Sequence, residues 1–563
     1  MNRVQAIDKI KKEPKISVLI VGAGINGIGT FRDLALQGVD VLLVDKSDYC
    51  SGASAASSHM VHGGIRYLEN GEFRLVREAV QERNRLIEVA PHLVKPLPTV
   101  FPIFKWFSGL LNAPLKFFGL LDKPSERGAV VIKIGMVLYD LYTKAQKTVP
   151  AHVFANRKES LAKFPRLNPE IIFTGTYYDG AMPSPERIAV EIIKDSIKLS
   201  DQAWAANYLR MDRTEGSRVY LVDELSGDQY YVQPDLLINA AGPWIDIANR
   251  ALGIETQFIG GTKGSHLVLD APEIRDAIKN HEFFFENKDG RIVLIFPLED
   301  KVMIGTSDIR IENPGEARCT ESEIDYFFEL VSRVFPDITL DRSQIVFQFS
   351  GVRPLPFTPA SSTGQISRDH KVEVIPPGSA VDFPIFSLVG GKWTSFRAFS
   401  EHTADQALDY LGRTRQQDTK EIAIGGGKDY PTGLAAQANF VDALADKYDL
   451  ELEIVKMIFD RYGTVADEIL AHADIDESPA SWPIPGYWPG ELAYLMQTED
   501  IVHLDDLILR RCMIGKLGLL SPEGLGALAE VAAQVKSWTE AEKQREIQRT
   551  IDIFKDGHGI DLN

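Results

Sequence analysis

The sequence predicts an α/β protein with a separate all-α domain at its C-terminal end, and two observations support this. Up to about residue 410, strand-like and helical stretches alternate, beginning with a strand–turn–helix–strand pattern over residues 16–45. From 434 to 563 the apolar residues recur at helical spacing. A polar, glycine-containing stretch, 411–433, lies between these regions and is expected to be a linker.

The first of these elements predicts a Rossmann-like βαβ unit. An apolar strand at residues 18–21 runs into a Gly-x-Gly-x-x-Gly turn, and a second apolar strand ends at Asp45. Gly22 permits the tight turn, Gly24 lets backbone approach a pyrophosphate, and Gly27 lets the helix pack closely on the strand. The phosphates would lie at the helix N-terminus, where free N–H groups favour anions. Asp45 would bind ribose hydroxyls, so a dinucleotide without a 2′-phosphate is expected.

Two later segments favour FAD over NAD as this dinucleotide, and a third segment suits a bound cofactor. Residues 50–66 are rich in Ser, Ala and Gly, which suits close packing of backbone against a cofactor. Residues 237–244 and 386–394 each form a strand that ends in a turn of small residues. A large dinucleotide needs several such close approaches, and a helix N-terminus beside the flavin would favour the negative charge of the reduced ring.

The cofactor-binding segments are predicted to be interleaved with a β-rich substrate domain. We expect cofactor segments at about 16–90, 150–245 and 350–410, and substrate or cap segments at about 91–150 and 246–349. Strands are predicted at 174–178, 218–222, 236–240, 292–296 and 302–304, with a hairpin turn at 225–229. A charged helix is predicted at 72–88, with its apolar side formed by Phe73, Val76, Val80 and Ile87. Prolines interrupt any helix over 91–102.

Residues 101–121 are apolar and aromatic, and Lys105 and Lys116 are their only charged residues. Two interpretations are open. The segment either forms packed turns of the core, or forms a monotopic membrane patch in which aromatic residues enter the lipid interface while lysines meet the headgroups. The second interpretation centres on Trp106, Phe107, Leu110, Leu111, Phe117 and Phe118, with Lys105, Lys116 and Lys123 nearby.

The composition excludes several classes of protein. The net charge of −18 argues against nucleic-acid binding, because a phosphate backbone needs a basic face. Cys50, Cys319 and Cys512 lie far apart in sequence and suggest neither a disulfide framework nor a metal site. The first 14 residues are polar and lysine-rich, without the apolar core of a secretory signal. No run of about 20 apolar residues occurs, so no membrane-spanning helix is expected.

A family resemblance joins these observations. Residues 57–69 read Ser-Ser-His-Met-Val-His-Gly-Gly-Ile-Arg-Tyr-Leu-Glu, which resembles the signature of the FAD-dependent glycerol-3-phosphate dehydrogenases. Further matches follow in the family's order at 263–266, 304–308, 350–355, 366–369 and 390–392. The helical tail carries Arg461-Tyr462-Gly463 and Leu509-Arg510-Arg511, similar to the family's C-terminal domain. The resemblance is strong over about residues 16–400 and looser beyond.

The resemblance implies roles for particular residues. Arg353 and Arg368 would clamp a substrate phosphate, since guanidinium forks match phosphate oxygens. Arg66 and Lys392 would add positive charge, and Tyr67 and Thr306 would bond substrate oxygens. His62 and His266 are both candidate bases for the hydroxyl proton, and the sequence does not choose between them. The residues expected to contact FAD are Gly22, Ala23, Gly24, Ile25, Asn26, Gly27, Asp45, Lys46, Ser54, Ser57, Ser58, His62, Gly63, Gly64, Ala241, Gly242, Gly391, Lys392, Trp393 and Thr394.

The sequence departs from the family at three places. Family members often carry Lys where His59 stands, and Thr where Ala241 stands. They also often carry Asp-Asp-Ala-Arg where this chain has Ser-Pro-Glu-Arg at 184–187, a run expected to lie in the substrate domain. Another phosphorylated polyol therefore remains an alternative substrate.

The leading hypothesis is oxidation of sn-glycerol 3-phosphate to dihydroxyacetone phosphate, with electrons passed from FAD to a membrane quinone. An oxidase that uses oxygen is the nearest alternative. An amine or amino-acid oxidase and a non-catalytic flavin-binding protein are alternatives of other classes. The resemblance implies a cytoplasmic protein, peripheral on the inner face of the cell membrane, and leaves a homodimer open.

Overall fold

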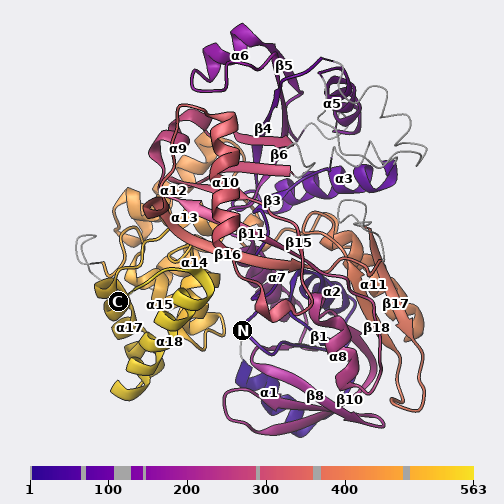
Figure 1. Ribbon diagram of the computed structural model, residues 1–563. Helices are drawn as coiled ribbons and strands as arrows, with labels where there is room; N and C mark the ends of the chain where they lie inside the picture. The colour runs from indigo at the N-terminus through magenta and orange to yellow at the C-terminus, as the bar shows by residue number, and fades with distance from the viewer. Residues whose placement is uncertain are drawn as a thin grey trace.

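The computed structural model describes residues 3–64, 72–106, 129–143, 148–286, 292–358, 369–472 and 482–562. Figure 1 shows three parts: a lower α/β layer, an upper sheet with its helices, and a helical C-terminal region beside them. The chain passes between the two sheets repeatedly, as the interleaved prediction required.

Eight strands of the described residues form the lower sheet, and its central strands are parallel. Its path runs β17 (His370–Ile375), β18 (Ile385–Gly390), β10 (Gln229–Asn239), β1 (Lys15–Val21), β2 (Val41–Val44) and β7 (Ala203–Ala206). Beside this path, β8 (Leu209–Glu215) and β9 (Arg218–Asp223) extend β10 as an antiparallel meander. The predicted hairpin at 225–229 joins β9 to β10.

Strand β1 is buried on both faces, which explains its unbroken apolar run. Val18 and Ile20 pack toward one face together with α2 (Ile25–Leu36), α7 (Pro185–Leu199) and α11 (Phe396–Tyr410). Leu19 and Val21 point to the other face, where they pack with α1 (Arg3–Lys12) and the β8–β9 meander. Side chains of a strand alternate between faces, so only a sheet covered on both sides needs apolar residues at every position.

The upper sheet has ten strands among the described residues. These are β3 (Met60–Val61), β4 (Lys95–Ile103), β5 (Val153–Asn156), β6 (Phe173–Ala181), β11 (Thr262–Leu269), β12 (Glu282–Glu286), β13 (Ile292–Leu298), β14 (Lys301–Gly305), β15 (Ile309–Arg310) and β16 (Ile345–Arg353). The predicted pair at 292–296 and 302–304 is the antiparallel pair β13–β14.

Helices cover this sheet at both ends. They are α3 (Phe73–Val89), α5 (Ala129–Thr143), α6 (Arg157–Lys163), α9 (Pro272–Ile278) and α10 (Glu321–Val334). Helix α3 buries Val76, Val80 and Ile87 as predicted, but Phe73 is exposed because it begins the helix. The short α8 (Ile245–Ala251) follows β10 in the lower layer.

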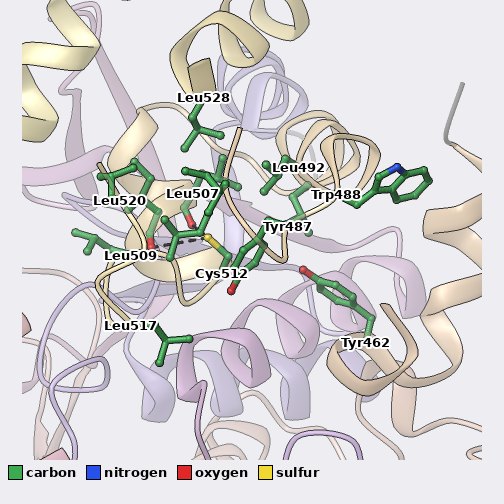
Figure 2. Close-up of a cluster of buried hydrophobic side chains, with 14 of the residues drawn as sticks. Tyr462, Tyr487, Trp488, Leu492, Leu507, Leu509, Cys512, Leu517, Leu520 and Leu528 are labelled. Atoms are coloured by element: carbon green, nitrogen blue, oxygen red, sulfur yellow. Dashed lines mark hydrogen bonds between the residues drawn. The ribbon is translucent and has the colours of Figure 1, made fainter. Parts of the chain in front are cut away.

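The C-terminal part is helical, as predicted. Its helices are α12 (Leu434–Tyr448), α13 (Leu452–Tyr462), α14 (Ala466–Ala471), α15 (Pro489–Thr498), α16 (Leu504–Asp506), α17 (Pro522–Lys536) and α18 (Glu540–His558), with a π-helical turn at Leu507–Arg511. Figure 2 shows the centre of its core, where Trp488 and Leu492 of the α15 region lie with Leu507 and Leu528. The Cys512 thiol donates to the Leu507 carbonyl, so it is a packed side chain of this core.

The C-terminal part shares its core with the upper sheet. Phe296, Met303, Phe347 and Phe349 of that sheet belong to the same buried cluster as the C-terminal helices. Residues 411–433 also pack against the lower layer: Ile424 is buried, and Gly425 N–H donates to Asp195 of α7 at 2.8 Å. Within the described residues, no helix combines the length and apolar character needed to cross a membrane. The proposed domain boundaries stay a prediction.

Candidate functional site

The glycine turn between β1 and α2 has the geometry expected of a phosphate-binding turn. Gly22 has φ +107°, and a Cβ there would lie 2.6 Å from the Ala240 carbonyl oxygen. A Cβ on Gly27 would lie 2.0 Å from the Gly22 carbonyl oxygen, so the helix approaches the turn as closely as glycine permits. Gly24 is the N-cap of α2 and makes no side-chain cap bond. The N-terminus of α2 therefore lies directly against a turn built of backbone, the arrangement that places a phosphate at a helix start.

Asp45 lies at the carboxyl end of β2, against this turn. Its carboxylate accepts hydrogen bonds from the Ala23 N–H at 2.7 Å and the Ser47 N–H at 2.9 Å. Burial raises the pKa of Asp45 to about 6 although both bonds lower it. Hydroxyl donors of a ribose would favour the charged carboxylate, so the environment of Asp45 fits a dinucleotide.

The segments that sequence reasoning assigned to the flavin lie against one another. The Ser54 hydroxyl accepts from the Ile25 N–H at the start of α2, and the Ser54 carbonyl accepts from Trp393 Nε1 at 2.8 Å. The His62 N–H donates to the Thr394 hydroxyl at 3.0 Å. Four chain segments, from 25 to 394, therefore meet beside the glycine turn.

Glycines at the end of β18 bring backbone near α2. Gly390 and Gly391 have φ +80° and +92°, and a Cβ on Gly391 would lie 2.9 Å from Asn26 Nδ2. Gly242 has φ +56° at the start of a 3₁₀ turn, and Ala241 precedes it. These glycine turns bring backbone close without a side chain, which suits a large planar cofactor, so the residues present fit FAD.

The backbone N–H of Gly63 is bound by buried polar side chains. Its N–H donates to the Tyr139 hydroxyl at 3.0 Å and to Asp179 Oδ1 at 3.1 Å. Arg83, fully buried, donates to the same Asp179 oxygen at 3.2 Å. Gly64 follows with φ +69°. This arrangement fixes the backbone between His62 and the end of the described segment.

Arg353 lies at the end of β16, next to the start of β11. Its guanidinium donates to the Thr306 hydroxyl at 3.0 Å, the Ser307 carbonyl at 3.1 Å and Asp308 at 3.1 Å. A Cβ on Gly264 would lie 2.3 Å from Arg353 Nη2. Glycine at 264 therefore makes room for the guanidinium, which lies beside Thr306.

His266 on β11 is buried between β14 and β16. It lies opposite Gly305 and Phe349, and its ring stacks on Phe349 with centroids 4.8 Å apart. The Ser58 hydroxyl lies 2.9 Å from its Nε2. Burial, together with the charge of Arg353, lowers the pKa of His266 to about 3, so the ring is neutral near pH 7.

A buried carboxylate, Glu323, binds side chains of strand β11. Glu323 of α10 accepts hydrogen bonds from Lys263 at 2.7 Å and from Ser265 at 2.8 Å, and also from Ser307. Burial alone would raise the pKa of Glu323, but these bonds lower it to about 2. The charged network fixes β11 and the Ser307 turn, and so fixes the frame of Arg353 and His266.

Some predicted site residues lie outside the described part of the chain, and the roles predicted for others stay predictions. Arg66, Tyr67 and Arg368 lie outside the described residues, as do 107–128, which hold most of the apolar segment. Lys46 lies over the Trp244 ring at 4.8 Å, and Ser57 Oγ accepts from the His59 N–H at 3.3 Å. Lys392 follows Gly391, and its charge contributes to the lowered pKa of His370, after burial.

Sequence reasoning missed Lys516, a residue of the C-terminal part whose side chain reaches Glu186 of α7 and His59. Its ammonium pairs with Glu186 and lies 3.4 Å from His59 Nε2. Burial and this charge keep the pKa of His59 well below its ordinary value. A lysine ammonium therefore lies beside His59, the position where the family resemblance led us to expect a lysine. No spacing in the sequence links Lys516 to His59 or Glu186.

The placement of residues 184–187 in a substrate domain is wrong. Pro185 begins α7, which packs on α2 in the lower layer. Arg187 forms two 2.8 Å bonds with Glu499 of the C-terminal part. The strand before this run belongs to the upper sheet, so the chain crosses between layers at the run itself, which sequence spacing does not reveal.

Comparison with known proteins agrees with this geometry. Residues 17–381 match the family of FAD dependent oxidoreductases, and residues 417–543 match the C-terminal domain of alpha-glycerophosphate oxidase. These matches define the class: a flavin-dependent oxidoreductase with an added helical domain.

Full-length relatives narrow the class. A Synechocystis glycerol-3-phosphate dehydrogenase is 31% identical over 94% of this chain and 95% of its own length. Glycerol-3-phosphate dehydrogenase 2 of Mycobacterium tuberculosis is 30% identical over 95% of this chain and 87% of its own. The crystal structure of glycerol-3-phosphate dehydrogenase from Bacillus halodurans complexed with FAD has a TM-score of 0.73 at 24% identity, covering 99% and 97% of the two chains. The chain belongs to the family of FAD-dependent glycerol-3-phosphate dehydrogenases.

Proposed function

We propose that this protein oxidises sn-glycerol 3-phosphate to dihydroxyacetone phosphate. Bound FAD supplies the acceptor for the hydride that leaves the secondary carbon. One observation carries the proposal: Arg353 on β16, His266 on β11 and Thr306 just after β14 lie close together, because these three strands are neighbours. His266 also contacts Ser58, which belongs to a segment expected to bind FAD.

Arg353 binds the phosphate in this proposal. Its guanidinium is already oriented by Thr306, Ser307 and Asp308, so little side-chain freedom is lost when a dianion arrives. Arg368, from its family motif, would supply the second fork of the clamp. Arg66, Tyr67 and Lys392 would complete the polar surroundings of the substrate.

His266 or His62 accepts the hydroxyl proton. His266 is neutral, and a dianionic substrate nearby would raise its low pKa toward the working range. The Ser58 hydroxyl at its Nε2 fixes the ring orientation. His62 stands next to Gly63, and its N–H is anchored to Thr394. The pH–rate profiles of His266→Asn and His62→Asn separate the two. The profile of the variant that lacks the true base should no longer show the pKa that limits wild-type turnover at low pH.

Anaerobic titration tests the reaction itself. Glycerol 3-phosphate should bleach the flavin absorbance of the purified protein, and glycerol should bleach it weakly. Bleaching by another polyol phosphate, but not by this one, would change the substrate. Bleaching by an amine or amino acid would replace the reaction class, and no bleaching by any of them would leave a flavin-binding protein without this activity.

The electron acceptor is proposed to be a quinone in a membrane, reached by peripheral attachment on the cytoplasmic face. An exposed apolar surface supports this: Trp106, Ile134 and Val153 are 52%, 56% and 56% exposed. The N-terminus of α5 is joined to this surface by the bonds Ala129 N–H to Lys105 O and Val130 N–H to Trp106 O. We call Trp106, Ile134, Val137 and Val153 the α5 surface.

Aromatic contacts link Trp106 of the α5 surface to rings on strands β5 and β6. The Trp106 ring packs edge-on to Phe173 at 4.8 Å, and Phe154 lies 4.9 Å from Phe173. Lys133 lies over Phe154 at 5.2 Å, where its ammonium could meet a lipid headgroup. Aromatic rings, aliphatic side chains and lysines together are the composition of an interfacial lipid contact.

Vesicle flotation tests the lipid contact. Trp106→Glu/Ile134→Glu should abolish flotation with vesicles of anionic and neutral phospholipid, while the FAD content stays unchanged. The matched control is Leu434→Glu, which alters an 85% exposed leucine on α12. If wild type floats and the double variant floats equally, the contact lies elsewhere. If oxygen consumption with peroxide release exceeds quinone-analogue reduction, the oxidase alternative holds.

A further inference from the structure

One buried carboxylate of the cofactor part is held almost entirely by the C-terminal part. Asp48, fully buried, accepts from Arg510 Nε at 2.6 Å and from Arg511 Nη1 and Nη2 at 2.8 Å each. Asn207 adds a fourth bond at 2.9 Å. Burial alone would raise the pKa of Asp48, but the two guanidinium groups hold it below its ordinary value.

Asp48 lies in a loop that is bonded directly to the glycine turn. Asp45 begins this loop and accepts from the Ala23 N–H. Cys50 ends it, and its N–H donates to the Ala23 carbonyl at 2.8 Å. Residues 45–50, which we call the acid loop, therefore move with the turn that would bind the pyrophosphate.

The two arginines are themselves fixed by the C-terminal part. Arg510 also donates to Asp505 at 2.9 Å and to Asp506. Arg511 donates to the Glu499 carbonyl at 3.1 Å, and Glu499 in turn binds Arg187 of α7. The π-helical turn Leu507–Arg511 places both guanidinium groups on the same side, toward the acid loop. Displacing this turn would remove both guanidinium partners from the Asp48 carboxylate.

We propose that docking of the C-terminal helical part and binding of FAD stabilise each other through the Asp48–Arg510–Arg511 cluster. Arg510 and Arg511 are positioning residues: they hold the acid loop, and the acid loop presents Asp45 to the ribose. This inference rests on the proposed cofactor site at residues 22–27 and 45. By linkage, whatever the docked helices add to FAD affinity, FAD adds to the docking of the helices.

Hydrogen exchange of the wild-type apoprotein tests this coupling. Addition of FAD should slow exchange in residues 18–50, and also in 499–516, which belong to the C-terminal part. Helix α6, at the far end of the upper sheet in Figure 1, is the internal control and should not change. Slowing in 18–50 without slowing in 499–516 overturns the coupling. No slowing in either segment overturns the cofactor site instead, so the two failures differ.

A matched pair of variants tests the arginine. Arg511→Met should weaken FAD binding to the apoprotein at least tenfold, measured by quenching of flavin fluorescence, and Arg511→Lys should recover part of the loss. The control is Arg461→Met, which breaks an ion pair with the buried Glu491 inside the C-terminal part. Equal losses of FAD affinity in Arg511→Met and Arg461→Met would mean general destabilisation and overturn the positioning role. The exchange measurement needs no variant, so a variant that fails to fold leaves the test intact.

Discussion

The glycine turn and the arginine cluster hold the same acid loop by opposite means. The turn acts through backbone: Gly22, Gly24 and Gly27 bring two strands and a helix together within one βαβ unit. The cluster acts through charge, and Arg511 lies 463 positions from Asp48 in the sequence. One side of the loop is thus built locally and the other by a distant part of the chain.

The difference concerns specificity as well as distance. A glycine turn tolerates almost no added atom, so its contribution is steric. A buried ion-pair cluster costs free energy to desolvate and often stabilises less than apolar packing would. Such a cluster can instead align two parts of the chain, since the Asp48 carboxylate accepts from two guanidinium groups of the C-terminal part. The predictions below contrast these two mechanisms.

The largest effect on FAD binding is expected from a substitution in the glycine turn. Gly27→Ala should abolish FAD retention, because its Cβ would lie 2.0 Å from the Gly22 carbonyl oxygen. The ratio of flavin to protein absorbance after desalting measures this. Gly526→Ala is the control: no atom lies within 4 Å of the added Cβ on α17, so FAD is kept and stability rises by up to ~1 kcal/mol. Full flavin content in Gly27→Ala would contradict the close approach of α2.

Loss of a buried ion pair between α7 and the C-terminal part should lower the free energy of unfolding. Arg187→Met leaves Glu499 buried without its bidentate partner, and loss of one partner of a buried pair costs about 3–5 kcal/mol. Because Lys194 and Arg511 still face Glu499, we expect the lower end of that range. Urea unfolding measures the free energy of unfolding.

The matched surface variant is Arg250→Met, whose pair with Glu255 is exposed. It should leave the free energy of unfolding unchanged within error. If Arg187→Met also left the free energy of unfolding unchanged, the interface between α7 and the C-terminal part would not depend on its ion pairs. The contrast with the glycine turn would then disappear.

Arg353 allows the same contrast inside the substrate site. Arg353→Ala should raise the KM for glycerol 3-phosphate about ten- to a hundredfold, since a hydrogen bond to a charged partner contributes about 1.5–3 kcal/mol. Gly264→Ala should act sterically on the same residue, because its Cβ would lie 2.3 Å from Arg353 Nη2. We expect a smaller rise in KM and unchanged FAD content. Equal proportional losses with glycerol and with glycerol 3-phosphate would remove the phosphate-binding role of Arg353.

The local half of the site could be predicted from the sequence because glycine spacing and strand ends determine it. The turn at 22–27, Asp45 and the turns at 242 and 391 required only knowledge of near neighbours. Strand β4 shows the limit: its prolines excluded a helix, as predicted, but did not indicate that Lys95–Ile103 forms a strand. It pairs along its length with β6 but with β12 only at Thr99 and Val100, so the proline nitrogens lie at positions that need no donor toward β12.

The distant half could not be predicted, because charge pairing between remote segments leaves no spacing signal. In the sequence, Arg510 and Arg511 form a family-like motif that indicates no partner, and no motif includes Lys516. Each lies opposite an acid that is separated from it by hundreds of residues. Knowing that residues 184–187 begin a helix of the lower layer would have brought Glu186 and Arg187 to this interface.

The smallest expected effect is a pH dependence of FAD binding that arises from Asp45. In the FAD-free fold burial raises its pKa to about 6, above the ordinary value of about 3.9. The folded carboxyl therefore keeps a proton that the unfolded chain releases, so the FAD-free fold loses stability as pH rises through this window. Ribose hydroxyls reverse this, because they donate to the charged carboxylate and lower its pKa.

FAD binding should then release a proton below about pH 6, so affinity should rise by up to about tenfold per pH unit up to that point and stay flat above it. Fluorescence titration of the apoprotein between about pH 5 and about pH 8 measures the slope, and the gain in Tm on adding FAD should widen over the same window. Asp45→Asn should bind FAD more weakly and without the slope, since an amide does not titrate there. Arg511→Met should keep the slope while lowering affinity at every pH, because it displaces the acid loop without removing the titrating group. A slope that survives in Asp45→Asn would assign the proton to another group, and the acid loop would then contribute to FAD binding by its position alone.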